Sequence, residues 1–94
     1  MGRLFDRVRA AVASERVVVG VHADDMLRER GIAAWQLVAG IAEGRLLRER
    51  PKAMPNSIVE VEQALADGTP VKCVWSFIAA AGVAKLVTVH FINR

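Results

Sequence analysis

Apolar residues recur with a helical period at the start of the chain and then form a short unbroken run. The spacing of residues such as Leu4 and Val8 predicts an amphipathic helix over residues 3–14, with its charged side chains pointing away from the apolar stripe. The β-branched run at residues 17–21 is too short for a helix and predicts a buried strand that ends near His22.

Two short helices are expected next, and together they form a helical hairpin. The first spans residues 23–30 and stops at Gly31, and the second spans residues 33–43 and stops at Gly44. Glycine suits the left-handed position that follows a helix. The second helix is expected to bury four apolar side chains, Trp35, Leu37, Val38 and Ile41.

The pattern changes from helical to alternating after the prolines at positions 51 and 55. Val59 and Val61 face one way while Glu60 and Glu62 face the other, which is typical of a sheet with one side in water. Turn residues at 66–70 and 80–82 separate three predicted strands, at residues 57–65, 71–77 and 84–92. The short segment Arg45–Arg50 is expected to add a further strand.

These elements predict one α+β domain. A chain of 94 residues is too short for two cores, so residues 1–94 form a single unit. Its order is an N-terminal helix (1–15), then β-α-α-β and an antiparallel β-meander (17–92), with the helices packed on one face of the sheet.

Composition and charge narrow the class of protein. The chain is 53% hydrophobic and 24% charged, which indicates a globular domain rather than a disordered one. Its net charge of +3 comes from the first half, where ten basic residues meet seven acidic ones. No run resembles a signal peptide or reaches the roughly 20 residues that cross a bilayer, so we expect a cytoplasmic protein without a membrane partner.

The single cysteine, Cys73, excludes a disulfide framework and any zinc site built from several thiolates. It alternates with Val71 and Trp75 and is expected to be a small buried hydrophobic residue. Nothing in its surroundings indicates an activated thiolate.

Five short motifs carry a resemblance to a known family. They are His22-Ala23-Asp24-Asp25-Met26-Leu27-Arg28-Glu29-Arg30-Gly31-Ile32, Glu43-Gly44, Pro55-Asn56-Ser57, Asp67-Gly68-Thr69-Pro70 and Val87-Thr88-Val89. In these the chain resembles the small bacterial family called domain of unknown function 4258, over residues 17–91. Such domains are similar in element order to RelE-type toxins, whose β-α-α-β-β-β fold several small ribonucleases share. The resemblance implies a metal-independent ribonuclease with an RNA substrate and an antitoxin-like protein partner.

The chain departs from the family pattern at three positions. Met26 stands where members often carry arginine, Lys72 where they often carry histidine, and His90 where tyrosine is common. The chain contains no tyrosine, so a catalytic tyrosine of the toxin type is absent.

Four residues are candidates for catalysis: His22, Arg30, Lys72 and His90. RNA cleavage through the 2′-hydroxyl needs a base, an acid and a cation for the phosphate, and these residue types supply all three without a cofactor or metal. Period-two counting places Thr88 and His90 on one strand face, and Lys72 and Ser76 on one face of the neighbouring strand.

Each candidate also has a structural interpretation. Asp24 and Asp25 could cap the helix that follows His22, and Arg30 suits the negative C-terminal end of that helix. His90 could be a residue at the edge of the core that bonds a backbone carbonyl. A metal site formed by His22, Asp24 and Asp25 is disfavoured, because adjacent helical residues point apart.

The densest basic run holds Arg45, Arg48, Arg50 and Lys52. With Trp35 or Trp75 it could bind single-stranded RNA through phosphate contacts and base stacking. A solvated edge strand, whose charges discourage pairing between sheets, is the simpler explanation.

Two classes of function stay open. The first is a toxin-like ribonuclease with His22 and His90 as acid and base, and with Arg30 and Lys72 stabilising phosphate charge. The second is a non-catalytic binding or assembly module, in which the N-terminal helix or a sheet edge joins two copies of the chain or holds a partner strand.

Overall fold

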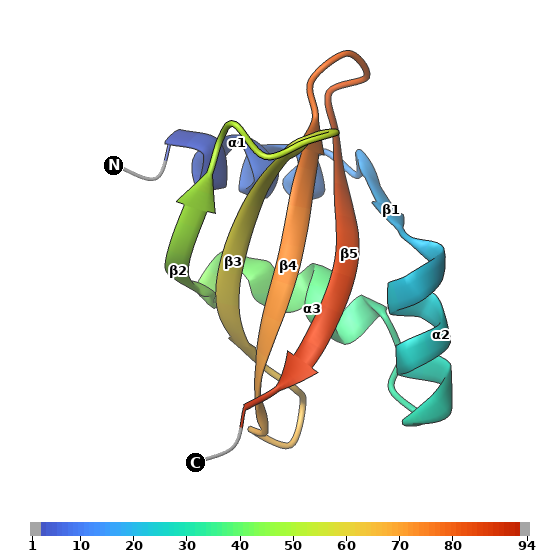
Figure 1. The fold of residues 1–94 in the computed structure, drawn as a ribbon. Coiled ribbons are helices and arrows are strands. Elements are labelled where there is room, and N and C mark those ends of the chain that lie inside the picture. The colour runs from blue at the N-terminus through green and yellow to red at the C-terminus, as the bar shows by residue number, and fades with distance from the viewer. Residues whose placement is uncertain (1–2, 93–94) are drawn as a thin grey trace.

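The computed structural model describes residues 3–92, which form a five-stranded sheet and a layer of helices (Figure 1). Along the chain the elements are α1 (Arg3–Ala13), β1 (Val17–Val19), α2 (Val21–Glu29), α3 (Trp35–Gly40), the 3-10 helix η1 (Ile41–Glu43), β2 (Arg45–Arg50), β3 (Ser57–Ala64), β4 (Pro70–Ile78) and β5 (Val83–Phe91). The strand order is β1-β5-β4-β3-β2. The predicted α+β class is therefore confirmed.

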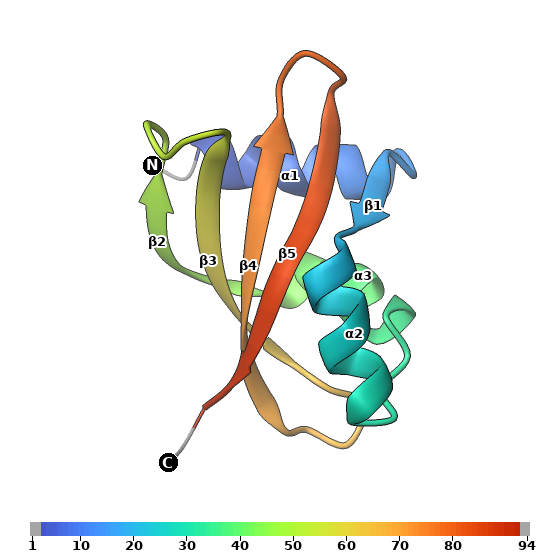
Figure 2. The same cartoon turned by 45° about the vertical axis from the view of Figure 1, so that its right-hand side comes forward.

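The helices lie on one face of the sheet, which we call the inner face; the opposite face is the outer face. α1 and α3 cross behind the strands, while α2 follows the edge beside β5 (Figures 1 and 2). β2, β3, β4 and β5 pair antiparallel, and β1 adds three residues in parallel to β5, a pairing that the sequence had not indicated. β2 forms one edge of the sheet, as the edge-strand interpretation expected.

The core lies between the inner face and the helices. α1 contributes Phe5, Val8 and Ala11, so its apolar stripe packs on the chain's own sheet and is not available to a second copy. Trp75 is the largest fully buried side chain. Burying apolar area of this kind is the main stabilising term of the fold.

One buried polar side chain links the sheet to α3. Gln63 accepts a hydrogen bond at Oε1 from Trp75 Nε1 (2.8 Å) and donates from Nε2 to the carbonyl oxygen of Leu37 (2.8 Å). Because both ends of the amide are bonded, its burial leaves no unsatisfied polar atom.

Two sequence predictions about the helices were wrong. The predicted buried strand ending near His22 is shorter and only partly buried: β1 ends at Val19, Gly20 is the N-cap, and α2 begins at Val21 rather than near residue 23. His22 consequently lies in the first turn of α2. Trp35 is 66% exposed rather than buried, since α3 turns Leu37 and Ile41 toward the sheet and Trp35 lies on the opposite side of the helix.

The predicted turns of the meander are present. Between β3 and β4, Asp67 Oδ1 accepts a hydrogen bond from the N–H of Thr69 (3.0 Å). Hydrogen bonding by the Thr69 side chain, together with this backbone bond, lowers the pKa of the Asp67 carboxyl. Gly68 in the same turn has φ +87°, a left-handed conformation that favours glycine. Within residues 3–92, no helix is long and apolar enough to span a bilayer.

Candidate functional site

The outer face of the sheet carries charged side chains in register across four strands. Strand pairing defines a first row, made of Arg45, Glu62, Lys72 and His90. Behind it lies a second row of Arg48, Glu60, Val74 and Thr88, and then a third row of Arg50, Ile58, Ser76 and Lys85. The two helices that cross the sheet lie on the other side of it (Figures 1 and 2).

Two β-bulges bring the basic side chains and the histidine to this face. The register of β2 shifts between Leu46 and Arg48, so Arg48 returns to the face that carries Arg45. β5 contains one extra residue, Val87, because Leu86 pairs with Trp75 while Thr88 pairs with Val74. Without that extra residue, strict alternation would turn His90 to the buried side with Leu86.

Ion pairs order the carboxylates of the outer face. Arg45 Nη2 lies 2.7 Å from Glu62 Oε1, and Glu60 bridges Arg50 (3.4 Å) and Lys72 (3.5 Å). The side chains of Glu60 and Glu62 are only 15% and 18% exposed, because the longer cationic side chains flank them. Both carboxylates therefore have fixed positions between cations.

The structure brings two of the four catalytic candidates together. Lys72 and His90 are direct partners on neighbouring strands, and His90 is exposed on the outer face. Arg30 follows α2, and its guanidinium lies 4.4 Å from the ring centre of Phe91, the residue after His90. His22 lies in the first turn of α2, and no hydrogen bond or ion pair within residues 3–92 joins it to Lys72 or His90.

The helix that contains His22 is not capped by the aspartates that follow this histidine. The N-cap of α2 is Gly20, without a side-chain cap, so Asp24 and Asp25 do not cap this helix. Asp24 instead accepts a hydrogen bond from Arg28 one turn later (2.9 Å). Among the residues that the structure describes, no three His, Cys, Asp or Glu side chains gather in a way that could hold a metal ion.

The basic run is divided between ion pairs and open surface. Arg45 and Arg50 pair with glutamates of β3, whereas Arg48 and Lys52 are exposed and form no ion pair within residues 3–92. Trp75 is fully buried and cannot stack on a base. Trp35 is exposed, but it lies on α3, on the other side of the sheet from these cations.

Sequence reasoning missed the two glutamates as site residues. Their alternation with Val59 and Val61 was visible, but it indicated only the solvated side of a strand. The pairing of β3 with β4 makes Glu62 a candidate, because it places this residue directly beside Lys72. No signal in the sequence specifies which residues of two strands are partners.

Cys73 offers no nucleophile. It is buried on the inner face, as expected, and burial raises the pKa of its thiol to about 12. The thiolate is therefore absent at neutral pH.

Comparison of the chain with family models, curated proteins and solved structures gives no match. The inference of a function consequently depends on the geometry of the outer face.

Proposed function

We propose that the protein is a metal-independent ribonuclease whose acid, base and phosphate-binding groups lie in the first row of the outer face. The observation that carries the proposal is the order Arg45-Glu62-Lys72-His90 across neighbouring strands. A carboxylate and an imidazole flank a cation there, which is the set of groups that cleavage through the 2′-hydroxyl requires.

The spacing of the row suits an in-line displacement at phosphorus. Glu62 and His90 are separated by one strand, so their backbones lie about 10 Å apart. Both side chains project from the outer face, so a phosphodiester group can lie between their polar atoms. Lys72, between them, is placed to neutralise the charge on the phosphate.

The roles follow from these positions. The Glu62 carboxylate takes the proton of the 2′-hydroxyl as that oxygen attacks phosphorus. The bond from phosphorus to the 5′-oxygen breaks, and the His90 imidazolium donates a proton to the leaving oxygen. The products are a 2′,3′-cyclic phosphate and a 5′-hydroxyl end. Arg45 orients Glu62 through their 2.7 Å contact, and the exposed Arg48 and Lys52 would bind the backbone of the substrate.

The two histidines of the chain provide a matched test. Single-stranded RNA is incubated with purified wild-type, His90→Ala and His22→Ala protein in the presence of a chelator. We expect His90→Ala to lower the cleavage rate by about 10²- to 10⁴-fold. His22→Ala removes the same group from another exposed surface and should retain wild-type activity.

Analysis of the product ends completes this test. Cyclic phosphate ends in the wild-type reaction agree with attack by the 2′-hydroxyl. Equal loss of activity in both histidine variants, with folding confirmed by circular dichroism, would rule out the first row as the site.

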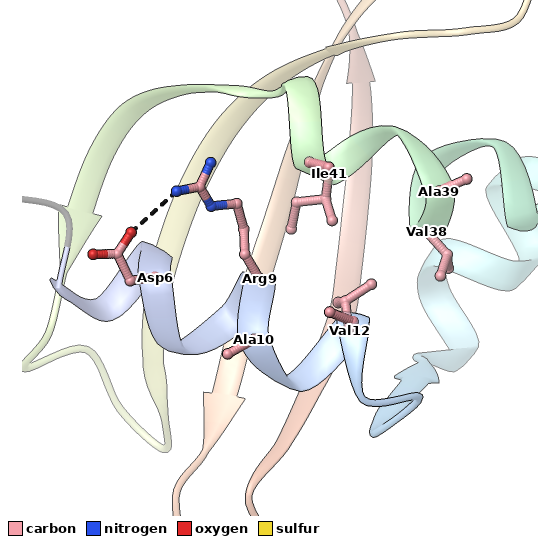
Figure 3. Close-up of a pocket in the computed structure, with 9 residues that line it drawn as sticks. Asp6, Arg9, Ala10, Val12, Val38, Ala39 and Ile41 are labelled. Carbon is pink, nitrogen blue, oxygen red and sulfur yellow. Dashed lines mark hydrogen bonds and ion pairs between the residues drawn. The ribbon is translucent and has the colours of Figure 1, made fainter.

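A non-catalytic protein-binding module is a second candidate, favoured by the uncharged segment that contains α3. Residues 31–42 contain no charged side chain. α1 and α3 enclose a groove of about 560 Å³, whose lining includes Val12 and Val38, with the Asp6–Arg9 ion pair at one end (Figure 3). A folded wild-type protein that leaves RNA intact would favour this function.

A further inference from the structure

A second basic surface lies between α1 and the hairpin that connects β4 to β5. The tip of this hairpin, residues 79–82, projects beyond α1 in both views (Figures 1 and 2). Two adjoining hollows of about 580 and 340 Å³ follow the gap, and they share Arg7, Phe77 and Ala79 in their linings. We call this surface the α1–hairpin groove.

Three arginines line the groove without a carboxylate partner. Arg3, Arg7 and Arg16 are exposed, and none of them forms an ion pair within the described residues. The one carboxylate among the lining residues, Glu49, accepts a hydrogen bond at Oε2 from the N–H of Phe5 (2.8 Å). Three guanidinium groups against one carboxylate leave the groove with an excess of positive charge.

The position of Arg16 is held by β5. Its carbonyl oxygen accepts a hydrogen bond from the N–H of Ala84 (2.9 Å). Its Nη1 atom lies beside Gly82, 3.4 Å from where a Cβ atom would be. Gly82 has φ +64°, a conformation that favours glycine. The absence of a side chain at this position also leaves room for the Arg16 guanidinium.

The arginines of α1 oppose the local preferences of a helix. Arg3 is in the first turn, where the helix dipole disfavours positive charge, and Arg7 repels it from one turn later. On the other side of α1, Arg9 pairs with Asp6 (3.1 Å) and lies 4.6 Å from the ring centre of Phe5. Residues that violate a local rule without structural compensation are typical of functional surfaces.

The groove continues the basic outer face around one end of the sheet. Arg50 and Lys85 of the third row are at the same end of the strands as Phe77. Along β4, Phe77 lies about 17 Å from Lys72, a distance that a short single strand of nucleotides can span. Guanidinium groups bind phosphates through paired hydrogen bonds, and a half-buried aromatic ring beside them is typical of single-strand binding grooves.

We infer that the α1–hairpin groove binds the phosphodiester backbone of single-stranded RNA, outside the first row of the outer face. The inference rests on the proposed function for the identity of its ligand. Binding in the groove requires no cleavage, so the two can be tested separately.

The test measures binding of a fluorescent 2′-O-methyl RNA of about 12 nucleotides, which lacks the attacking hydroxyl and cannot be cleaved. Fluorescence anisotropy compares the wild type with Arg7→Gln and with Arg9→Gln as the matched control. We expect Arg7→Gln to weaken binding roughly three- to tenfold and to reduce the slope of log K against log salt by about 0.7. Arg9→Gln should stay within about twofold of the wild type, because its charge is already paired.

Thermal unfolding separates a binding role from a structural one. Removing the repulsion on α1 should leave the Tm of Arg7→Gln unchanged or raise it by about 1–3 °C. Equal weakening by the two variants, or no binding by the wild type, would overturn the inference. Stronger binding of a polyglutamate peptide than of RNA would also overturn it, in favour of an acidic protein partner.

Two further measurements keep this inference distinct from the proposed function. Adding Arg7→Gln to His90→Ala should weaken binding of the 2′-O-methyl RNA by the same roughly three- to tenfold as in the wild-type background, whether or not the first row is catalytic. A dinucleotide substrate is too short to reach the groove, so its cleavage should not change in Arg7→Gln. Loss of dinucleotide cleavage in Arg7→Gln would show that the arginine acts on the first row, against the inference.

Discussion

The two faces of the same sheet have opposite chemistry. On β4, Val71, Cys73 and Trp75 are fully buried on the inner face, while Lys72 and its row partners bear charge on the outer face. The inner face excludes water, so every apolar atom there adds to stability. The outer face contains ion pairs that solvent screens, so its side chains can be selected for binding and chemistry at small cost to the fold.

Neighbouring residues on β5 give the sharpest test of this contrast. Leu86 is fully buried on the inner face, and Lys85 points to the outer face. Leu86→Ala should lower the free energy of unfolding by about 2–5 kcal/mol, through lost transfer energy and a cavity. Lys85→Ala should change it by less than about 0.5 kcal/mol.

Urea denaturation of both variants measures these differences. Comparable losses at the two positions would mean that the outer face also contributes a packed interface, for example with a second copy of the chain. The contrast between the faces would then fail.

An intermediate effect is expected from Cys73 at alkaline pH. Burial raises the pKa of its thiol from 9.0 to about 12. Between these values the unfolded chain loses the proton and the folded chain keeps it, so stability is full below pH 9 and falls as pH rises. The loss attributable to Cys73 should be about 1.4 kcal/mol by pH 10.

Cys73→Ala provides the control for this titration, because the variant lacks the thiol and keeps every other titratable group of the wild type. The free energies of unfolding of the two proteins are compared by urea denaturation under reducing conditions from pH 7 to 10. A difference between them that is constant with pH would show that water reaches the thiol in the folded protein.

The inner face was largely predictable from the sequence. The alternation of valines with glutamates in β3, and the period-two spacing of Val71, Cys73 and Trp75 in β4, indicate which side of each strand is buried. These patterns are local and depend only on the chain's own neighbours. Trp35 shows their limit, because the apolar content of a short helix does not specify which side faces the sheet.

The outer face was predictable only in part, because a site across strands depends on register. Lys72 and His90 were recognised by residue type, but their pairing comes from long-range contacts. Glu62 joins them through the pairing of β3 with β4. The bulges that aim Arg48 and His90 outward have no sequence signature here, since no glycine marks either position.

A small effect on stability is expected from Glu60, although its carboxylate contacts two cations. Glu60→Gln removes the contacts to Arg50 and Lys72, which lie at 3.4 and 3.5 Å, longer than a well-formed charged hydrogen bond. Both cations are partly exposed, so the loss should be at most about 1 kcal/mol and should shrink in high salt. Glu43→Gln, which removes an exposed charge without an ion pair among the described residues, is the control. Urea denaturation at low and high sodium chloride measures both variants. A loss above about 2 kcal/mol that persists in high salt would place Glu60 among the residues that hold the fold together, and the division of labour between the two faces would have to be abandoned.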